Sequence, residues 1–462
     1  MRNTALKVVF IIVLTLSLGI LSIAAQEGEI TLVVYGEPGP DCEDPNNAWE
    51  FCLYSRSVTE LWYEQHPNIR IEWVNAGWDA ELYSALNEAI DEGNPPDITI
   101  GETFLPLMMR DGLLLPLDLD EEIHENIVPG TVAYVTDEEG ILYGVPIFTG
   151  VFAWEINPDV FYTAGLLPET TDLTTWDAVL DASTTITDTG GSIYYGNTIL
   201  GPTNLPAAAL FRFAPYYYMT GADFCNMPAC DEPTLNDPLG VAAYEFFREL
   251  VQSAPEEIVF NGEEGYVLSQ LFNGTTAMQT AGSWHIAWAA GSGCVDCRYL
   301  PLPLPTENTE ATNVVVGNAI YSILASTEHP EEAKMFLEFL ASDEIQTRVL
   351  WTGVGGRLPA TYSALQMVLD VSEGDSLDNL PSFWSIELSR EPEDAITFAS
   401  DYIPFVHQLM ETDLRTLPFW STDMNILWNE LFLEVLQTDR PIEEILDDYQ
   451  VRAEQIMHAS DE

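Results

Sequence analysis

The sequence predicts an α/β protein built on an open, doubly wound sheet. Three short apolar runs, at residues 30–35, 69–74 and 98–100, have the length and composition of β-strands. Two amphipathic segments, at residues 57–66 and 81–92, separate them and have the periodicity of helices. The order strand, helix, strand, helix, strand is typical of parallel sheets with crossover helices.

Each of these elements is bounded by residues that end it. The first strand, ITLVVY, runs into a loop rich in Gly and Pro. Pro67 stops the first helix, and Gly93 closes the second. The strand at residues 69–74, IRIEWV, alternates in polarity, and Pro95 and Pro96 lead into the third strand.

A second α/β region follows. Residues 143–147 form a short predicted strand that continues into the apolar stretch 148–156, and residues 314–324 are again strand-like. RYLPLPLP, residues 298–305, has too many prolines for a central strand and suits an edge. The segment that runs through Gly282 looks like the end of a helix. Further helices are predicted at residues 176–186, 240–252, 425–436 and 441–456, and after His329, where proline and acidic residues form the first turn.

The first 25 residues have the pattern of a secretory signal peptide. Arg2 and Lys7 precede a nearly apolar run, and Ser22, Ile23 and Ala24 supply small residues for cleavage. A retained membrane anchor is the alternative, because the run is almost long enough to cross a bilayer. After cleavage, about 437 residues remain, enough for two or three domains. We expect an exported protein, periplasmic or extracellular, that lacks a lipid-anchor cysteine directly after the run.

The charge is strongly acidic, with 15 basic and 74 acidic residues and a net charge of -59. Such a surface repels nucleic acid and anionic membranes, so we expect neither as a partner. Adaptation to a salty or acidic environment and attraction of a cationic ligand both remain explanations. Hydrophobic residues make up 47% of the chain, which argues against disorder.

The six cysteines fall into three close pairs. In an exported chain, near neighbours favour local disulfides. A zinc site made of the last four cysteines is the alternative. The predicted disulfides are Cys42–Cys52, Cys225–Cys230 and Cys294–Cys297.

Several longer motifs follow one another along the chain. They are LWYEQHPNIRIEWV (61–74), LNEAIDEGNPPDITI (86–100), DGLLLPLD (111–118), GILYGVPI (140–147), WEINPDVFYTAGL (154–166), TTWDAVL (174–180), LFNGTTAMQTAGSW (271–284), HPEEAKMFLEFLAS (329–342) and PIEEILDDYQ (441–450). In this order they resemble the extracellular solute-binding proteins (family 1) of ABC importers, the sugar-binding family that includes maltose-binding protein. Residues 358–418 match this family poorly.

The resemblance implies a two-lobed periplasmic-binding-protein fold of type II. Each lobe would be an open sheet flanked by helices, and crossover hinge strands would join the lobes. The implied parts are lobe 1 at residues 26–147 and 315–350, lobe 2 at residues 148–314 and 351–462, and hinges near 147–150, 312–317 and 350–356. The implied protein is a monomer without a cofactor that encloses a sugar by hinge closure and delivers it to membrane permease subunits.

Candidate ligand-binding residues follow the predicted strands, because ligands of open α/β sheets bind at the carboxyl ends of strands. Glu37 follows the first strand, Trp78 and Asp79 follow the second, and Glu102 follows the third. Their carboxylates could accept hydrogen bonds from sugar hydroxyls. For each acid, a solvated surface carboxylate is the alternative.

Aromatic side chains are the second group of candidates, because the C–H faces of sugars stack on aromatic rings. Trp284 matches a position that commonly lines the binding cleft in the family, and a core tryptophan is the alternative. Where maltose-binding protein has an acid in its first crossover, this chain has Gly150, so maltodextrin specificity is not inferred. The remaining candidates, each with a structural alternative, are Trp154, Trp351, Trp420, Arg357 and Asn318.

Two other functions compete with sugar binding. Acidic and tryptophan side chains could surround a cationic solute such as a polyamine. Paired carboxylates could form a glycosidase, but their separation is not readable from sequence. Neither a Gly-x-Ser-x-Gly motif nor a His-Glu-x-x-His motif occurs, so we expect a binding protein without catalytic residues.

Overall fold

The computed structural model describes residues 29–36, 50–78, 80–137, 139–201, 206–226, 232–261, 263–285, 300–307, 313–352, 357–375, 377, 380, 391, 394–411, 413–415, 417 and 422–460. The expected signal peptide lies outside these ranges. Within them, no helix is both long and apolar enough to cross a membrane.

The N-terminal part of the chain forms the predicted parallel sheet. β1 (Ile30–Tyr35) lies between β2 (Ile69–Val74) and β3 (Ile98–Gly101) and pairs with both in parallel. α2 (Glu50–Gln65) and α3 (Ala80–Asp91) connect the three strands. The strand predictions are therefore confirmed, and so is the βαβ order.

The helix α2 begins earlier than the apolar pattern predicts, at Glu50 rather than at residue 57. Its first turns bury Cys52 and Tyr54. Polar residues between these two and Val58 interrupt the apolar periodicity, which is why the sequence pattern missed the start of the helix.

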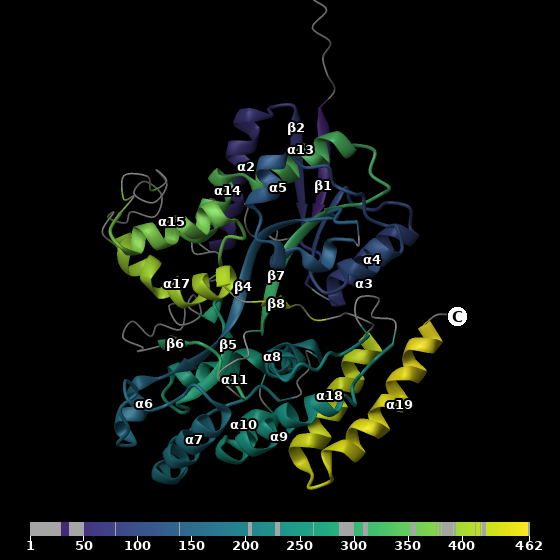
Figure 1. Cartoon of the computed structure of the whole chain (residues 1–462). Coiled ribbons are helices and arrows are strands. Elements are labelled where there is room, and N and C mark those ends of the chain that lie inside the picture. Colours follow the sequence, from purple (N-terminus) through teal and green to yellow (C-terminus); the bar gives the residue numbers. More distant parts are fainter. Residues whose placement is uncertain are drawn as a thin grey trace, which may run out of the picture.

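Two long antiparallel strands, β4 (Val145–Ile156) and β7 (Asn313–Ile323), continue the sheet; we call them the crossover strands. β7 pairs with β3 and with residues 145–151 of β4. Beyond residue 151, β4 pairs with β5 (Met278–Gly282) on one side and with β6 (Leu300–Leu302) on the other. The order β2-β1-β3-β7-β4-β5 is thus continuous, and β4 and β7 connect the upper and lower groups of elements in Figure 1. In the described chain β6 pairs with β4 alone, as its prolines predict.

At Thr149, a third chain segment joins the crossover strands. Thr149 pairs with Asn318 of β7 and also with Leu358, with two backbone hydrogen bonds of 2.8 Å between Thr149 and Leu358. Residues 149, 318 and 358 therefore lie side by side, although they are far apart in the sequence.

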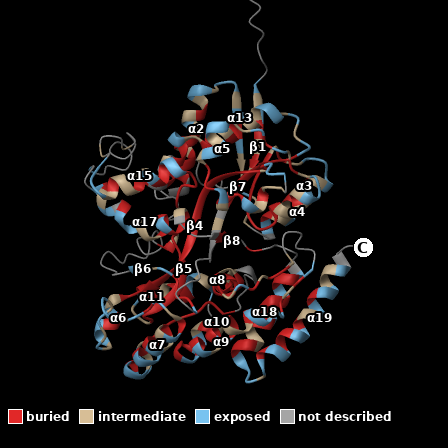
Figure 2. Cartoon of the chain, viewed as in Figure 1, coloured by how far each residue is buried: buried red, intermediate tan, exposed pale blue. Residues whose placement is uncertain are grey.

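Two large hydrophobic cores lie at the two ends of the crossover strands. The first contains residues from Leu32 to Phe148 and from Ala319 to Val349. The second contains residues from Phe152 to Leu304 and from Leu417 to Ala453. Figure 2 shows the buried strands between helices whose outer faces are exposed. Around the first core, the remaining elements are α4 (Leu105–Arg110), α5 (Glu121–Asn126), α13 (Pro330–Ala341), α14 (Asp343–Thr352) and the short 3-10 helices Pro129–Thr131 and Ala133–Val135.

The second core is covered mainly by helices. They are α6 (Pro158–Thr163), α7 (Trp176–Gly190), α8 (Pro206–Met219), α9 (Val241–Leu250), α10 (Glu256–Asn261), α11 (Glu264–Phe272), α18 (Thr422–Gln437), α19 (Ile442–Ser460) and the 3-10 helices Pro238–Gly240 and Val251–Ser253. The two C-terminal helices return to this core, where α18 packs on α8 and α9. Trp428 of α18 lies 5.5 Å from Phe213 of α8, centroid to centroid.

The prediction of a helix that ends near Gly282 is wrong. The helix α11 ends at Phe272, and Gly274, with a φ of 70°, turns the chain. The following residues form the strand β5, in which Met278 pairs with Ile156 of β4. Pairing with a distant strand therefore determines the conformation of this segment.

A third, smaller core contains the residues that match the family pattern poorly. α15 (Tyr362–Ser372) and α17 (Asp394–Glu411) pack together and bury Val151 and Ala153 of β4. The short strand β8 (Asp413–Arg415) pairs in parallel with the start of β7.

Candidate functional site

The carboxyl ends of the three parallel strands meet at one edge of the sheet, as expected from their common direction. Glu102 follows β3 and is 9% exposed. Trp78 follows β2 and packs, half-buried, against the first core. Glu37 and Asp79, the other two candidates from these strand ends, lie outside the described residues.

Arg357 lies against two aromatic rings from other parts of the chain. Its guanidinium carbon is 4.6 Å from the ring centroid of Phe148 on β4 and 5.8 Å from that of Trp78. At these distances the positive charge is attracted by the ring faces. A strand end, a crossover strand and the segment after α14 thus meet at Arg357, and Phe148 is a contact that the sequence did not identify.

Trp284 lies just beyond the end of β5 and is partly buried against the second core. Its ring meets Phe152 of β4 in an edge-to-face contact, with centroids 5.2 Å apart and an interplanar angle of 81°. Ring atoms of Trp284 also lie beside the backbone of Gly150. The Trp284 side chain is therefore of intermediate exposure: it packs against the second core but is not fully buried.

Arg357, with the rings of Phe148 and Trp78, and Trp284 lie on the same face of the crossover strands. Successive side chains of a strand alternate between faces, so Phe148 and Gly150 share one face of β4. Arg357 contacts this face at Phe148, and Trp284 contacts it at Gly150. The two contact points are two residues apart, or roughly 7 Å along the strand. We define the candidate site as the strand-end residues Trp78 and Glu102 together with Arg357, Phe148 and Trp284.

Two predicted ligand contacts are not accessible in the structure. Trp154 has 0% exposure and belongs to the second core, where β5 and β6 flank it on both sides. Trp351 also has 0% exposure and belongs to the third core. Both side chains are therefore core tryptophans in this structure, which is the structural alternative stated for them above. We exclude them from the candidate site because neither is accessible to a ligand.

The other candidates are described only in part. Trp420 lies outside the described residues. For Asn318 only the backbone is described, and it pairs with Thr149.

Cys52 and Cys225 are described, and neither is a free thiol. Their predicted partners and the third cysteine pair lie outside the described ranges, so the three pairings remain predictions.

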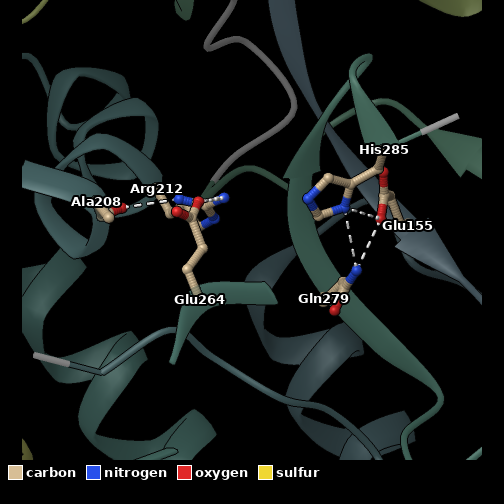
Figure 3. A network of polar contacts seen from close by, with 6 residues as sticks. All are labelled: Glu155, Ala208, Arg212, Glu264, Gln279 and His285. Atoms are coloured by element: carbon tan, nitrogen blue, oxygen red, sulfur yellow. Dashed lines mark hydrogen bonds and ion pairs between the residues drawn. The ribbon is translucent and has the colours of Figure 1, made fainter. Parts of the chain in front are cut away.

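Figure 3 shows a buried polar cluster that contains Glu155 of β4. Glu155, Gln279 and His285 each have 0% exposure. Glu155 Oε2 accepts a hydrogen bond from Gln279 Nε2 at 2.9 Å and lies 3.1 Å from His285 Nδ1. Glu155 and Phe152 point to opposite faces of β4, because side chains alternate along a strand. The cluster nevertheless adjoins the candidate site, since the ring of His285 lies 6.3 Å from that of Trp284, centroid to centroid.

An ion pair between a buried arginine and a partly exposed glutamate, also shown in Figure 3, joins two helices of the second core. Arg212 of α8 is 4% exposed, and its Nη2 lies 2.5 Å from Glu264 Oε1 of α11. The guanidinium also donates to the Ala208 carbonyl. Both partners are bound within the protein, so we assign this pair to the packing of α8 on α11.

Other features of the described surface do not extend the site. A hollow of about 800 Å³ lies beside α5 and the start of α14, and none of its lining residues belongs to the candidate site. Its lining is rich in carboxylates. The side chains of Asn126, Asp343 and Ser363 within it are hydrogen-bonded to one another. Across the described ranges, no group of His, Cys, Asp and Glu side chains is arranged to hold a metal ion.

The fold is shared with solved sugar-binding proteins, each covering 93% of this chain. The sugar-binding protein MalE from the phytopathogen Xanthomonas citri is 16% identical, with a TM-score of 0.71 and 98% of its own chain covered. The cyclic alpha-maltosyl-1,6-maltose binding protein from Arthrobacter globiformis is also 16% identical, with a TM-score of 0.70 and 98% covered. An ABC transporter solute-binding protein from Thermotoga lettingae, bound with alpha-D-tagatose, is 19% identical, with a TM-score of 0.63 and 100% covered. These structures confirm the two-lobed α/β fold class.

Sequence comparison identifies the family. No curated protein sequence is significantly similar to this chain. The sequence profile of the bacterial extracellular solute-binding proteins, however, matches residues 54–347, more than half of the chain. The chain therefore belongs to the bacterial extracellular solute-binding proteins.

Proposed function

We propose that this protein is the substrate-binding component of an ABC importer and that its solute is a mono- or oligosaccharide. The observation that carries the proposal is the shared face of the crossover strands, on which Trp284 and the group formed by Arg357, Phe148 and Trp78 lie about two residues apart. The partly buried rings of Trp284 and Trp78 offer stacking surfaces to the C–H faces of a sugar, while Phe148, which is 3% exposed, lies behind the guanidinium. The guanidinium can donate hydrogen bonds to sugar hydroxyls, and the Glu102 carboxylate can accept them.

The arrangement of the cores supports a hinge mechanism. Two large cores lie at opposite ends of the crossover strands. We propose that they are the centres of two lobes, one at residues 26–147 and 315–350 and the other at residues 148–314 and 351–462. Within the second lobe, residues 351–414 contribute to the smaller third core, which also contains Val128 of the first lobe. A solute held between lobes favours closure, because it gains contacts with both. We further propose that the closed, monomeric form delivers the solute to permease subunits at the outer face of the cytoplasmic membrane.

Related proteins support a carbohydrate as the solute. The structures similar to this chain include receptors of maltosyl-maltose, tagatose and, for the GacH receptor of Streptomyces glaucescens, acarbose. These ligands differ in length and linkage, so the class of solute is proposed here and not the individual sugar.

Arg357 argues against the cationic solute. Its charge lies over the Phe148 and Trp78 rings, at distances of 4.6 and 5.8 Å. A polyamine that stacked on Trp78 would approach this guanidinium, and like charges at short range repel, whereas the Glu102 carboxylate of the same site would attract it. A neutral sugar meets no such barrier.

Isothermal titration of the purified full chain tests the proposal, with one panel of mono- and oligosaccharides and one of polyamines. We expect saturable heat from at least one sugar and none from the polyamines. A thermal-shift screen should agree, because a ligand at 100 times its Kd adds about 2.7 kcal/mol of stability. Binding of a polyamine alone would contradict the proposal, and chromatographic detection of sugar cleavage products would favour an enzyme.

A further inference from the structure

Three glycines from three different strands lie beneath the indole of Trp284. A Cβ atom built on Gly282 of β5 would lie 2.2 Å from Cζ3 and Cη2 of the indole. A Cβ on Gly150 of β4 would lie 2.8 Å from its Cε3, and one on Gly317 of β7 would lie 3.4 Å from its Cζ3. The benzo ring of Trp284 is therefore close to the backbone of all three strands.

The strand pairing explains why these glycines meet. Gly150 pairs with Gly317, and Gly282 pairs with Phe152, two residues further along β4. This is the point at which β4 leaves β7 and begins to pair with β5. Trp284 covers this junction, and Phe152 contacts the edge of the indole. Phe211 of α8 lies beside the same place, 3.4 Å from the Cβ position of Gly317 and 5.3 Å from the Phe152 ring centroid.

These glycines are required for space and not for backbone conformation. None of the three is among the described glycines with positive φ, so an alanine can adopt the same backbone. The added methyl group, however, collides with the ring to different extents. Carbon atoms in contact prefer about 3.5–4.0 Å, so Gly282→Ala would lift the indole by more than about 1 Å, Gly150→Ala by less, and Gly317→Ala hardly at all.

We propose that Gly150 and Gly282 are positioning residues that set the height of the Trp284 indole above the crossover strands and thereby determine which solute fits. This inference rests on the proposed function. Because Gly150 has no side chain and the indole fills the space above it, the solute meets the C–H-binding face of the indole at this point and not a side chain of residue 150. A raised indole would occupy volume that the solute needs.

Matched alanine variants test the proposal: Gly282→Ala, Gly150→Ala, and Gly317→Ala as the control with ordinary contact distance. The chain has 12 tryptophans, so total fluorescence does not isolate one of them. The full-length protein is therefore labelled with 5-fluorotryptophan, and the ¹⁹F resonance lost in Trp284→Phe identifies residue 284. We expect this resonance to shift most in Gly282→Ala, less in Gly150→Ala and least in Gly317→Ala. Thermal unfolding verifies that each variant folds, and Gly150→Ala carries the test if Gly282→Ala does not.

Affinity for the sugar found by titration provides the second readout. One added methyl group in a fitted pocket costs about tenfold or more in affinity, and we expect such a loss for Gly282→Ala but not for Gly317→Ala. In a Trp284→Phe background the smaller ring leaves room, so Gly282→Ala should then cost little. Equal losses in Gly282→Ala and Gly317→Ala, or an unmoved ¹⁹F resonance in Gly282→Ala and Gly150→Ala, would overturn the proposal. If no sugar binds to any variant, the proposed function fails, while the order of the ¹⁹F shifts still decides whether the glycines position Trp284.

Discussion

The side chain of Gln346 should be among the most important single hydrogen-bonding groups of the crossover. It lies on α14 with 0% exposure. Its Nε2 is 3.1 Å from the Pro146 carbonyl, 3.0 Å from that of Ile147 and 3.2 Å from that of Leu340. Its Oε1 accepts a hydrogen bond of 2.8 Å from the backbone N–H of Ala360. One amide thus joins β4 to the chain segment around residues 358–360, in which Leu358 pairs with Thr149 of β4.

The position of the amide matches an irregularity in the sheet. The register of β4 against β7 shifts between Pro146 and Phe148, so Ile147 has no partner on β7. A residue left over at such a bulge has backbone groups that must be satisfied elsewhere. Gln346 supplies the donor for the carbonyl groups of Pro146 and of the unpaired Ile147.

We predict that Gln346→Leu destabilises the empty protein by about 2–4 kcal/mol. The amide has two N–H groups and one accepting oxygen, so it maintains about three buried hydrogen bonds, each with a net contribution of roughly 0.5–1.5 kcal/mol. Leucine fills a similar volume but leaves the Ala360 N–H and the carbonyls buried without a partner.

Urea unfolding of the unliganded protein measures this loss. Gln366→Leu on α15 is the matched control, because Gln366 is exposed and bonded only to Asp370 among the described contacts. A surface change of this kind should alter stability by no more than about 0.5 kcal/mol. If Gln346→Leu and Gln366→Leu were equally stable, the amide would not hold the crossover together, and the reasoning from buried hydrogen bonds would be refuted here.

The remaining predictions concern the site and the exported state. Trp284→Ala should weaken sugar binding by roughly 1–3 kcal/mol, whereas Trp154→Ala should lower the stability of the empty protein by roughly 3–5 kcal/mol; normal affinity with collapsed stability in Trp284→Ala would make that residue structural. Small-angle scattering should give a smaller radius of gyration at saturating sugar, and an unchanged radius would argue against hinge closure. The affinity for a neutral sugar should hardly change between low salt and 1 M salt, because only charged ligands feel the screening; a steep fall would indicate ionic recognition. Mass spectrometry of non-reduced peptides should find three local disulfides: Cys42–Cys52, Cys225–Cys230 and Cys294–Cys297. Stoichiometric zinc together with free thiols would contradict this prediction.

Local patterns predicted the elements whose conformation is determined locally. The strands β1 and β2 match their predicted bounds because alternation and flanking turns define them. The strand β5 was missed because its five residues contain no strand signal of their own, and pairing with β4 makes them extended. Contacts between distant segments set the conformation there.

The tryptophans likewise show that contacts between distant segments are not predictable from local sequence patterns. Trp154 lies on β4, and Trp284 lies just beyond the end of its partner strand β5. Only Trp154 has a neighbouring strand on each side and is fully enclosed. The contact of Arg357 with Phe148 depends on how the segment after α14 returns to β4. The alternation Phe148, Gly150, Phe152 was readable in the sequence and would have indicated one shared face; only the structure shows that an indole covers its glycine.

The distribution of the acidic residues bears on why the chain is so negative. The helix α5 has the sequence EEIHEN and no buried residue. On α19, Glu443, Glu444, Asp447 and Asp448 are exposed, while the apolar residues between them are buried. Both helices carry their acids on solvent-facing surfaces, where charge governs hydration and association more than fold. At the candidate site, the described charged residues are one carboxylate, Glu102, and one guanidinium, that of Arg357, which lies against two rings. The exposed acids of α5 and α19 lie on helices that contribute no residue to the candidate site, so adaptation to the surroundings accounts for them more directly than attraction of a cationic ligand.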